Sequence, residues 1–157
     1  DPEHRRLSNM KWTGGVEAPN QVSDGYPVLL ASTASLAGLN ARLAAQGREA
    51  VGIERFRPNI VLEGIEAHDE DRLDVIRIAA AEEVQLQPVK PCPRCPIPNI
   101  DPATAQVTPE VSDTLQAYRR SEIVGGAVAF GMNAIVQKGA DQTLRVGQDV
   151  TADWRFD

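Results

Sequence analysis

The apolar positions along the chain fall into short continuous runs and into stretches with helical spacing. Continuous apolar or β-branched runs are typical of buried strands, and we expect strands at residues 26–31, 59–62, 75–78, 84–89, 125–136 and 143–150. Helical spacing of leucines predicts a helix over residues 35–46, opened by Ser32-Thr33 and ended by Gly47. A second helix is expected over residues 109–120, with Thr108 as its N-cap and Pro109 at the first helical position. Residues 79–83, between two expected strands, would also tolerate a helix.

This order of elements predicts a mainly β fold with inserted helices. The strands do not alternate regularly with helices as in a parallel α/β fold, so a closed or nearly closed β-structure is favoured, and the last two strands are expected to pair. A chain of 157 residues suits one domain. Residues 1–21 carry few large apolar groups and are expected to be a lead-in from a missing N-terminal β-domain or a tail. The domain itself is expected over residues 22–152, followed by a tail at 153–157.

The charge balance restricts the partners. Sixteen Lys and Arg against 22 Asp and Glu give a net charge of −6, which argues against a nucleic-acid surface because phosphate backbones require a basic one. A single anionic ligand would need a local arginine cluster. No apolar run is long enough for a membrane span, and no apolar signal core follows the N-terminus, so a cytoplasmic location is expected. Asp1 in place of Met suggests a chain cut from a longer protein.

The only two cysteines, Cys92 and Cys95, lie in the segment Lys-Pro-Cys-Pro-Arg-Cys-Pro over residues 90–96. Its prolines exclude a helix interior and predict an ordered loop, and the flanking Lys90 and Arg94 favour the thiolate form. A structural zinc site is disfavoured because it needs four ligands, and a thioredoxin-type dithiol is disfavoured because Pro96 blocks a following helix. Incidental or disulfide-bonded thiols on a loop remain an alternative. The acidic run 68–71 is expected to be a solvated turn, with a hard-cation site as the alternative.

Several sequence blocks in a fixed order resemble one family. The blocks are Ser-Asp-Gly-Tyr-Pro at 23–27, Ser-Leu with Leu-Asn at 35–40, Arg-Phe-Arg-Pro-Asn-Ile-Val at 55–61 and Pro-Cys-Pro-Arg-Cys at 91–95. Together they resemble the MOSC domain of molybdenum cofactor sulfurases, and more closely the subgroup of the mitochondrial amidoxime reducing component and its bacterial relatives. The resemblance covers residues 22–152. It implies a closed β-barrel related to the barrel domain of pyruvate kinase, which binds the molybdenum cofactor (molybdopterin).

The resemblance also implies roles for individual residues. Cys95 matches the thiolate that binds molybdenum and is the expected catalytic and metal-binding residue; a thiolate suits this metal. Arg57 and Asn59 match positions that grip the phosphate and the pterin, and they are expected to point to the same side around Pro58. Further cofactor contacts are expected at Asp24, Gly25, Tyr26 and Asn133, the last standing where reductase relatives often carry a tyrosine. For Arg55, a cofactor contact and a solvated or ion-paired side chain are both open.

The function implied by the resemblance is the reduction of small N-hydroxylated compounds. Electrons would come from a separate protein of the flavin, ferredoxin or haem type. The alternative is a sulfur-carrier or cofactor-binding module, in which Cys92 or Cys95 carries a persulfide without redox turnover. A third expectation is that this fragment alone is inactive, because the family's reductases have an N-terminal β-domain that forms the other wall of the site.

Overall fold

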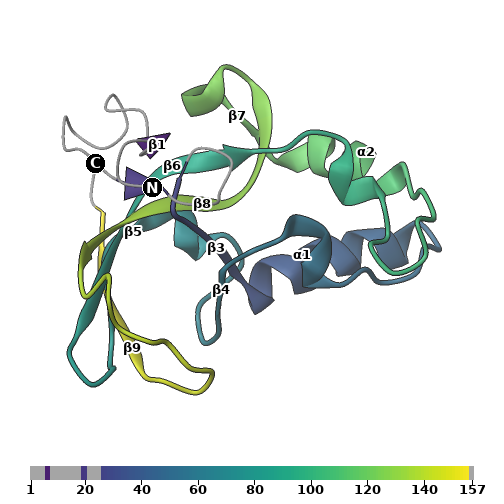
Figure 1. The fold of residues 1–157 in the computed structure, drawn as a ribbon. Helices are drawn as coiled ribbons and strands as arrows, with labels where there is room; N and C mark the ends of the chain where they lie inside the picture. Colours follow the sequence, from purple (N-terminus) through teal and green to yellow (C-terminus); the bar gives the residue numbers. More distant parts are fainter. Residues whose placement is uncertain (1–5, 8–18, 21–25, 156–157) are drawn as a thin grey trace.

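The computed structural model describes residues 6–7, 19–20 and 26–155, and its fold is mainly β with two α-helices in that part of the chain (Figure 1). The strands are β1 (Arg6–Leu7), β2 (Pro19–Asn20), β3 (Val28–Ser32), β4 (Ile60–Leu62), β5 (Leu73–Ile78), β6 (Val84–Pro93), β7 (Arg120–Ser121), β8 (Ala127–Lys138) and β9 (Val150–Trp154). The α-helices are α1 (Thr33–Ala45) and α2 (Glu110–Tyr118). Short 3₁₀ helices are η1 (Ile53–Phe56), η2 (Asp69–Arg72), η3 (Ile97–Asn99) and η4 (Glu122–Val124).

The main sheet has the strand order β4-β3-β8-β6-β5-β9, with β7 added to β8. Only β3 and β4 are parallel, and the long strands β6 and β8 form its centre. The sheet curls into a half-barrel (Figure 1). The expected mainly β class with inserted helices is therefore confirmed. The expected closed barrel is not, because β4 and β9 are the two edges of the sheet and no ladder joins them in the described residues.

The C-terminal part of the chain differs from the sequence prediction. Residues 143–149 form a loop, and β9 begins only at Val150. Val146 is 107% exposed, so its apolar side chain marks no buried strand. The expected pairing of this segment with residues 125–136 is also wrong, since β8 pairs with β3, β6 and β7 while β9 pairs with β5. The segment 79–83 is a bend rather than a helix.

The helices begin for different local reasons. Ser32 ends β3 and caps α1, because its hydroxyl accepts a hydrogen bond from the Ser35 amide at 3.1 Å. Helix α2 begins one residue later than expected, after Pro109, which offers no side-chain cap. The Asn99 Oδ1 accepts from the Ser112 amide in the first turn of α2 at 2.8 Å. Thr108 instead donates its backbone N–H to the Asn99 carbonyl at 2.7 Å. This bond ties the start of α2 to η3, next to the cysteine segment.

The core lies on both faces of the sheet because neighbouring strand residues point in opposite directions. Leu30 packs with Ile76 and Leu86 inside the half-barrel. The adjacent Ala31 packs on the other face, against α1 and α2. On that face the rings of Phe56 and Phe130 stack with centroids 4.0 Å apart. This stack joins η1 to β8.

The proline-rich end of β6 is extended rather than looped. Pro88, Pro91 and Pro93 all lie within this strand. The β6–β8 register shifts between residues 88 and 90 and again between 91 and 93, and prolines are tolerated at such irregularities because the ladder bond is already missing there. The expected loop is therefore wrong for Cys92, which belongs to β6. Cys95 lies in the loop that follows.

Candidate functional site

A cavity of about 360 Å³ lies where the end of β6, the η1–β4 connection and η3 meet. Five of the residues expected in the site line it: Tyr26, Arg57, Asn59, Cys95 and Asn133. Asp24 and Gly25 lie outside the described residues. The structure thus brings together residues that are up to 107 positions apart in sequence numbering, from Tyr26 to Asn133. Their roles toward a ligand stay predictions.

Both cysteines line the cavity. Cys95 is exposed, whereas Cys92 is half-buried, and the two are not joined by a disulfide. The Cys92 Sγ donates to the Pro93 carbonyl at 3.8 Å. An exposed sulfur on a loop reaches a bound group with less rearrangement than a half-buried sulfur in a strand. Cys95 is therefore better placed than Cys92 to contact such a group.

Arg57 lines the cavity and has an uncommon backbone conformation. It ends η1 in the left-handed region, with φ 55°, and its N–H donates to the Glu54 carbonyl at 3.1 Å. The expectation that Arg57 and Asn59 share a side by strand alternation is therefore wrong in its reason, although both line the cavity. Asn59 is fixed by β3 through two hydrogen bonds. Its side-chain Oδ1 accepts from the Leu29 backbone N–H at 2.7 Å, and its backbone N–H donates to the Leu29 carbonyl at 2.9 Å.

Arg55 holds the wall formed by η3. Its Nη1 donates to the Asn99 carbonyl at 3.2 Å and to the Pro98 carbonyl at 3.4 Å, and its Nη2 lies 3.9 Å from the Asp101 carboxylate. The side chain is 9% exposed. Of the two alternatives for Arg55, the structure shows the ion-paired form. Arg55 also lines the cavity.

Arg94 lies between the two cysteines and faces inward. Its Nε and Nη2 donate to the Phe130 carbonyl at 2.9 and 2.8 Å, and its Nη1 donates to the Phe56 carbonyl at 2.8 Å. Burial lowers the pKa of Arg94, while the nearby Cys92 and Cys95 thiols act to raise it. From the sequence, Arg94 is expected to be a flanking cation and a candidate member of a local arginine cluster. No sequence pattern shows that its side chain reaches back to β8.

The charge of the cavity is opposite to that of the chain. Four cationic side chains line it, those of Arg55, Arg57, Lys90 and Arg94, and its described lining contains no Asp or Glu. The chain as a whole has a net charge of −6. Guanidinium groups bind phosphate oxygens, an asparagine carboxamide suits a pterin edge, and a thiolate suits molybdenum. The residues present therefore fit the molybdenum cofactor that the sequence led us to expect.

The comparisons with known proteins show which family the chain belongs to. The family model of the MOSC domain matches residues 17–151. The chain belongs to the MOSC domain family. Among curated relatives, the rat mitochondrial amidoxime reducing component 2 is 38% identical over 81% of the chain and 37% of the relative. The human component 1 is 34% identical over 82% of the chain and 37% of the relative. The mouse component 1 is 32% identical over 96% of the chain and 44% of the relative. The expected resemblance to this family is confirmed.

The MOSC domain chain spans less than half the length of the relatives to which it was compared. The relatives are mitochondrial by name, so the expected cytoplasmic location is not supported. Within the described part of the chain, no helix has the length and apolar character needed to cross a membrane. The division of the chain at residues 22 and 152 stays a prediction.

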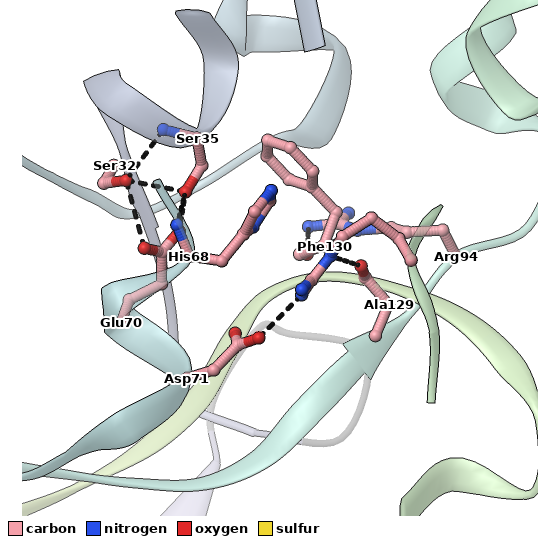
Figure 2. Close-up of polar contacts among 9 residues, drawn as sticks. Ser32, Ser35, His68, Glu70, Asp71, Arg94, Ala129 and Phe130 are labelled. Atoms are coloured by element: carbon pink, nitrogen blue, oxygen red, sulfur yellow. Dashed lines mark hydrogen bonds and ion pairs between the residues drawn. The ribbon is translucent and has the colours of Figure 1, made fainter. Parts of the chain in front are cut away.

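The MOSC domain also buries a polar cluster that the sequence did not suggest (Figure 2). The Glu70 side chain is fully buried, and its carboxylate accepts from Ser35 Oγ at 2.6 Å and from Ser32 Oγ at 3.0 Å. Burial raises the pKa of Glu70, and the serine hydrogen bonds partly offset this. The expected solvated turn is therefore wrong at Asp69 and Glu70, which are both buried. No group of three or more metal-ligating side chains occurs among the described residues.

His68 and Arg119 complete this region. The His68 ring packs against Phe130 at 5.6 Å and Tyr118 at 5.8 Å between ring centroids. Arg119 donates to the Asp71 carboxylate and to the Ala129 carbonyl, both at 2.8 Å. Burial and the nearby Arg119 and Arg42 charges lower the pKa of His68 to about 4. His68 is therefore neutral at pH 7, and it does not line the cavity.

Proposed function

We propose that this MOSC domain binds the molybdenum cofactor in the cavity and forms part of a reductase of small N-hydroxylated compounds. The observation that carries this proposal is the lining of the cavity, which combines an exposed thiol, four cationic side chains and two carboxamides. The relatives are named for amidoxime reduction, which supports the same class of substrate.

Within this proposal, each residue has a defined task. Cys95 would hold the metal through its thiolate, and Arg57 would hold the phosphate of the cofactor. Asn59, fixed by its hydrogen bond to β3, would contact the pterin, with Tyr26 and Asn133 on the neighbouring wall. Asp24 and Gly25, outside the described residues, are proposed as a further cofactor contact. When bound, the cofactor would supply the change of metal oxidation state that a reduction of an N–O bond requires.

The protein's part in such a reaction is to orient and to protect. The cations of the cavity would hold the anionic end of the cofactor in place while Cys95 fixes the metal. The electron donor would be a separate protein of the flavin, ferredoxin or haem type. We also propose that the full site needs the remainder of the natural protein, because contacts to an anion that stays open to water are screened and weak. The fragment alone would then be inactive.

A second function is suggested by the two thiols at one cavity. Cys92 and Cys95 both line it, and a persulfide on either would make the domain a sulfur carrier. This alternative predicts a labile sulfur that cyanide releases as thiocyanate, in a protein free of metal. The reductase proposal predicts molybdenum bound in proportion to the protein.

The deciding experiment compares two matched variants of the full-length protein made in a host that synthesises the cofactor. Cys95→Ser is expected to lose bound molybdenum, whereas Cys92→Ser should keep most of it, because Cys92 is half-buried in β6. Metal analysis and reduction of a model amidoxime with an artificial electron donor are the measurements. Equal molybdenum content in the two variants would contradict the assignment of Cys95 as the ligand.

A further inference from the structure

We propose that Arg94 is the specificity-determining residue of the cavity, making the space beside Cys95 selective for an anionic ligand group while joining the walls of that space. The proposal rests on the proposed function for the identity of the site. Its evidence is independent of any bound cofactor, because it comes from the contacts of Arg94 itself.

The Arg94 side chain links three separate parts of the fold. It starts directly after β6, reaches the carbonyl of Phe56 at the end of η1, and reaches the carbonyl of Phe130 in β8. Its backbone N–H adds a bond to the Val128 carbonyl at 2.8 Å. Phe56 directly precedes Arg57, so the position of this cavity cation depends on Arg94. The next residue after Arg94 is Cys95.

The positive charge of Arg94 is not neutralised by a carboxylate. Among the residues that the structure describes, no Asp or Glu lies within ion-pair distance of its guanidinium. Its hydrogen-bond partners are peptide carbonyls, whose partial charges compensate a full charge only in part. A cation in such a partly shielded site acts more strongly on a nearby anion than a cation in water does. An anionic group beside Cys95 is therefore favoured over a neutral one of the same size.

Strand β8 is shaped to admit this guanidinium. Gly131 follows the carbonyl that Arg94 binds and has a φ of 83°. A Cβ at this position would lie 2.6 Å from the Leu30 carbonyl oxygen and 3.5 Å from Arg94 Nη2. Because a side chain here would displace β3 or crowd the guanidinium, the glycine keeps Arg94 in place.

Arg119 offers a matched control. It also donates from its Nε to a β8 carbonyl, that of Ala129, at 2.8 Å. Its charge, however, is paired with Asp71 at 2.8 Å, and it does not line the cavity. Substitution of Arg94 removes two hydrogen bonds to the Phe130 carbonyl of β8, and substitution of Arg119 removes one to the Ala129 carbonyl. Of the two arginines, only Arg94 should affect charge selection at the thiol.

The test uses the full-length protein purified from a host that cannot make the cofactor. The rates at which iodoacetate and iodoacetamide alkylate Cys95 are measured by peptide mass spectrometry. The ratio of the iodoacetate rate to the iodoacetamide rate is then divided by the same ratio for a small thiol. Both reagents attack the same thiolate, so its fraction cancels and the ratio reports the local charge. Arg94→Gln should lower the ratio about five- to tenfold. Arg94→Lys should largely restore it, and Arg119→Gln should leave it unchanged.

An unchanged ratio in a folded Arg94→Gln protein would overturn the proposal, as would an equal loss in Arg119→Gln. If no Arg94 variant folds, the wild-type protein still decides. In 1 M salt, surface charges are screened within about 3 Å, so only a shielded cation at the thiol preserves a preference for iodoacetate. Loss of that preference would refute the role of Arg94. Because no cofactor is present, this outcome is separate from a failure to bind molybdenum.

Discussion

Protonation of His68 is expected to destabilise the fold when the pH falls below neutrality. The ring lies between Phe130 and Tyr118, and neither ring nitrogen has a hydrogen-bond partner in the described structure. An added proton would place a charge in this position, close to Arg119 and Arg42, with no acceptor for either N–H. The neutral imidazole is therefore the form that the folded state prefers.

The size and sign of the effect follow from the shift in pKa. The pKa of His68 is lowered from 6.5 to about 4 in the folded protein, so between these values the unfolded chain binds more protons. The contribution of neutral His68 to the free energy of unfolding is fully present above pH 6.5 and is lost as the pH falls toward 4. A shift of this size in a fully shielded group corresponds to about 3 kcal/mol. Since His68 is only partly buried, screening by solvent reduces the expected loss to about 1–2 kcal/mol.

Glu70 acts in the opposite direction and must be separated from His68. Its pKa is raised in the folded state, so its stabilising contribution is present in acid and is lost as the pH rises through the folded value. The Glu70 contribution cancels in the difference between the wild-type protein and His68→Phe, because Glu70 is unchanged in both. Phenylalanine keeps a ring against Phe130 and Tyr118 but cannot be protonated. It also keeps the same backbone constraint, since His68 has a φ of 64°.

Urea unfolding at pH 7.0, 6.0, 5.0 and 4.5 measures the effect. The wild-type protein should lose about 1–2 kcal/mol more than His68→Phe between the two ends of this range. The His68 pKa can be read directly from its imidazole NMR signals, which His4→Gln distinguishes from those of the chain's other histidine. The reasoning fails if the two proteins lose stability in parallel, or if His68 titrates near 6.5 in the folded state.

Two further predictions concern the walls of the cavity. Gly131→Ala should destabilise the fold by about 2–3 kcal/mol in urea unfolding, because its Cβ would meet a β3 carbonyl at 2.6 Å. Gly147→Ala is the control, with a φ of 92° but nothing within 4 Å, and a similar cost in both would show that backbone strain alone is responsible. Arg57→Ala in the full-length protein should reduce pterin content while leaving the melting temperature nearly unchanged, since Arg57 lines the cavity outside the apolar core. Full retention of pterin would remove Arg57 from the phosphate site.

Local sequence patterns predicted the first strand and helix well. The apolar run that ends at Ala31 became β3, and Leu39 and Leu43 face the core from α1. These features depend on neighbours within one or two turns, which the sequence displays directly. The same reasoning failed for residues 143–149, because no local pattern shows whether an apolar residue such as Val146 will find a partner strand.

The site was predicted in part, and the missing parts depend on long-range contacts. Tyr26, Arg57, Asn59 and Cys95 were named from the resemblance to the family, and all four line one cavity. The burial of Glu70 could not be predicted, because its hydroxyl partners lie 35 and 38 residues away in the sequence. An acidic run without those partners reads as a solvated turn.

The positive cavity in an acidic chain is explained by where the carboxylates lie. Arg72, Arg77 and Arg119 form ion pairs with Asp69, Asp153 and Asp71 outside the cavity. At physiological ionic strength, charges separated by more than about 8 Å of solvent are largely screened, so the net charge of −6 acts weakly on a ligand inside. The four cations that line the cavity lie beside the ligand and are screened much less. The local charge is therefore expected to govern which ligand the cavity favours, and repulsion of nucleic acid by the overall charge stays a prediction.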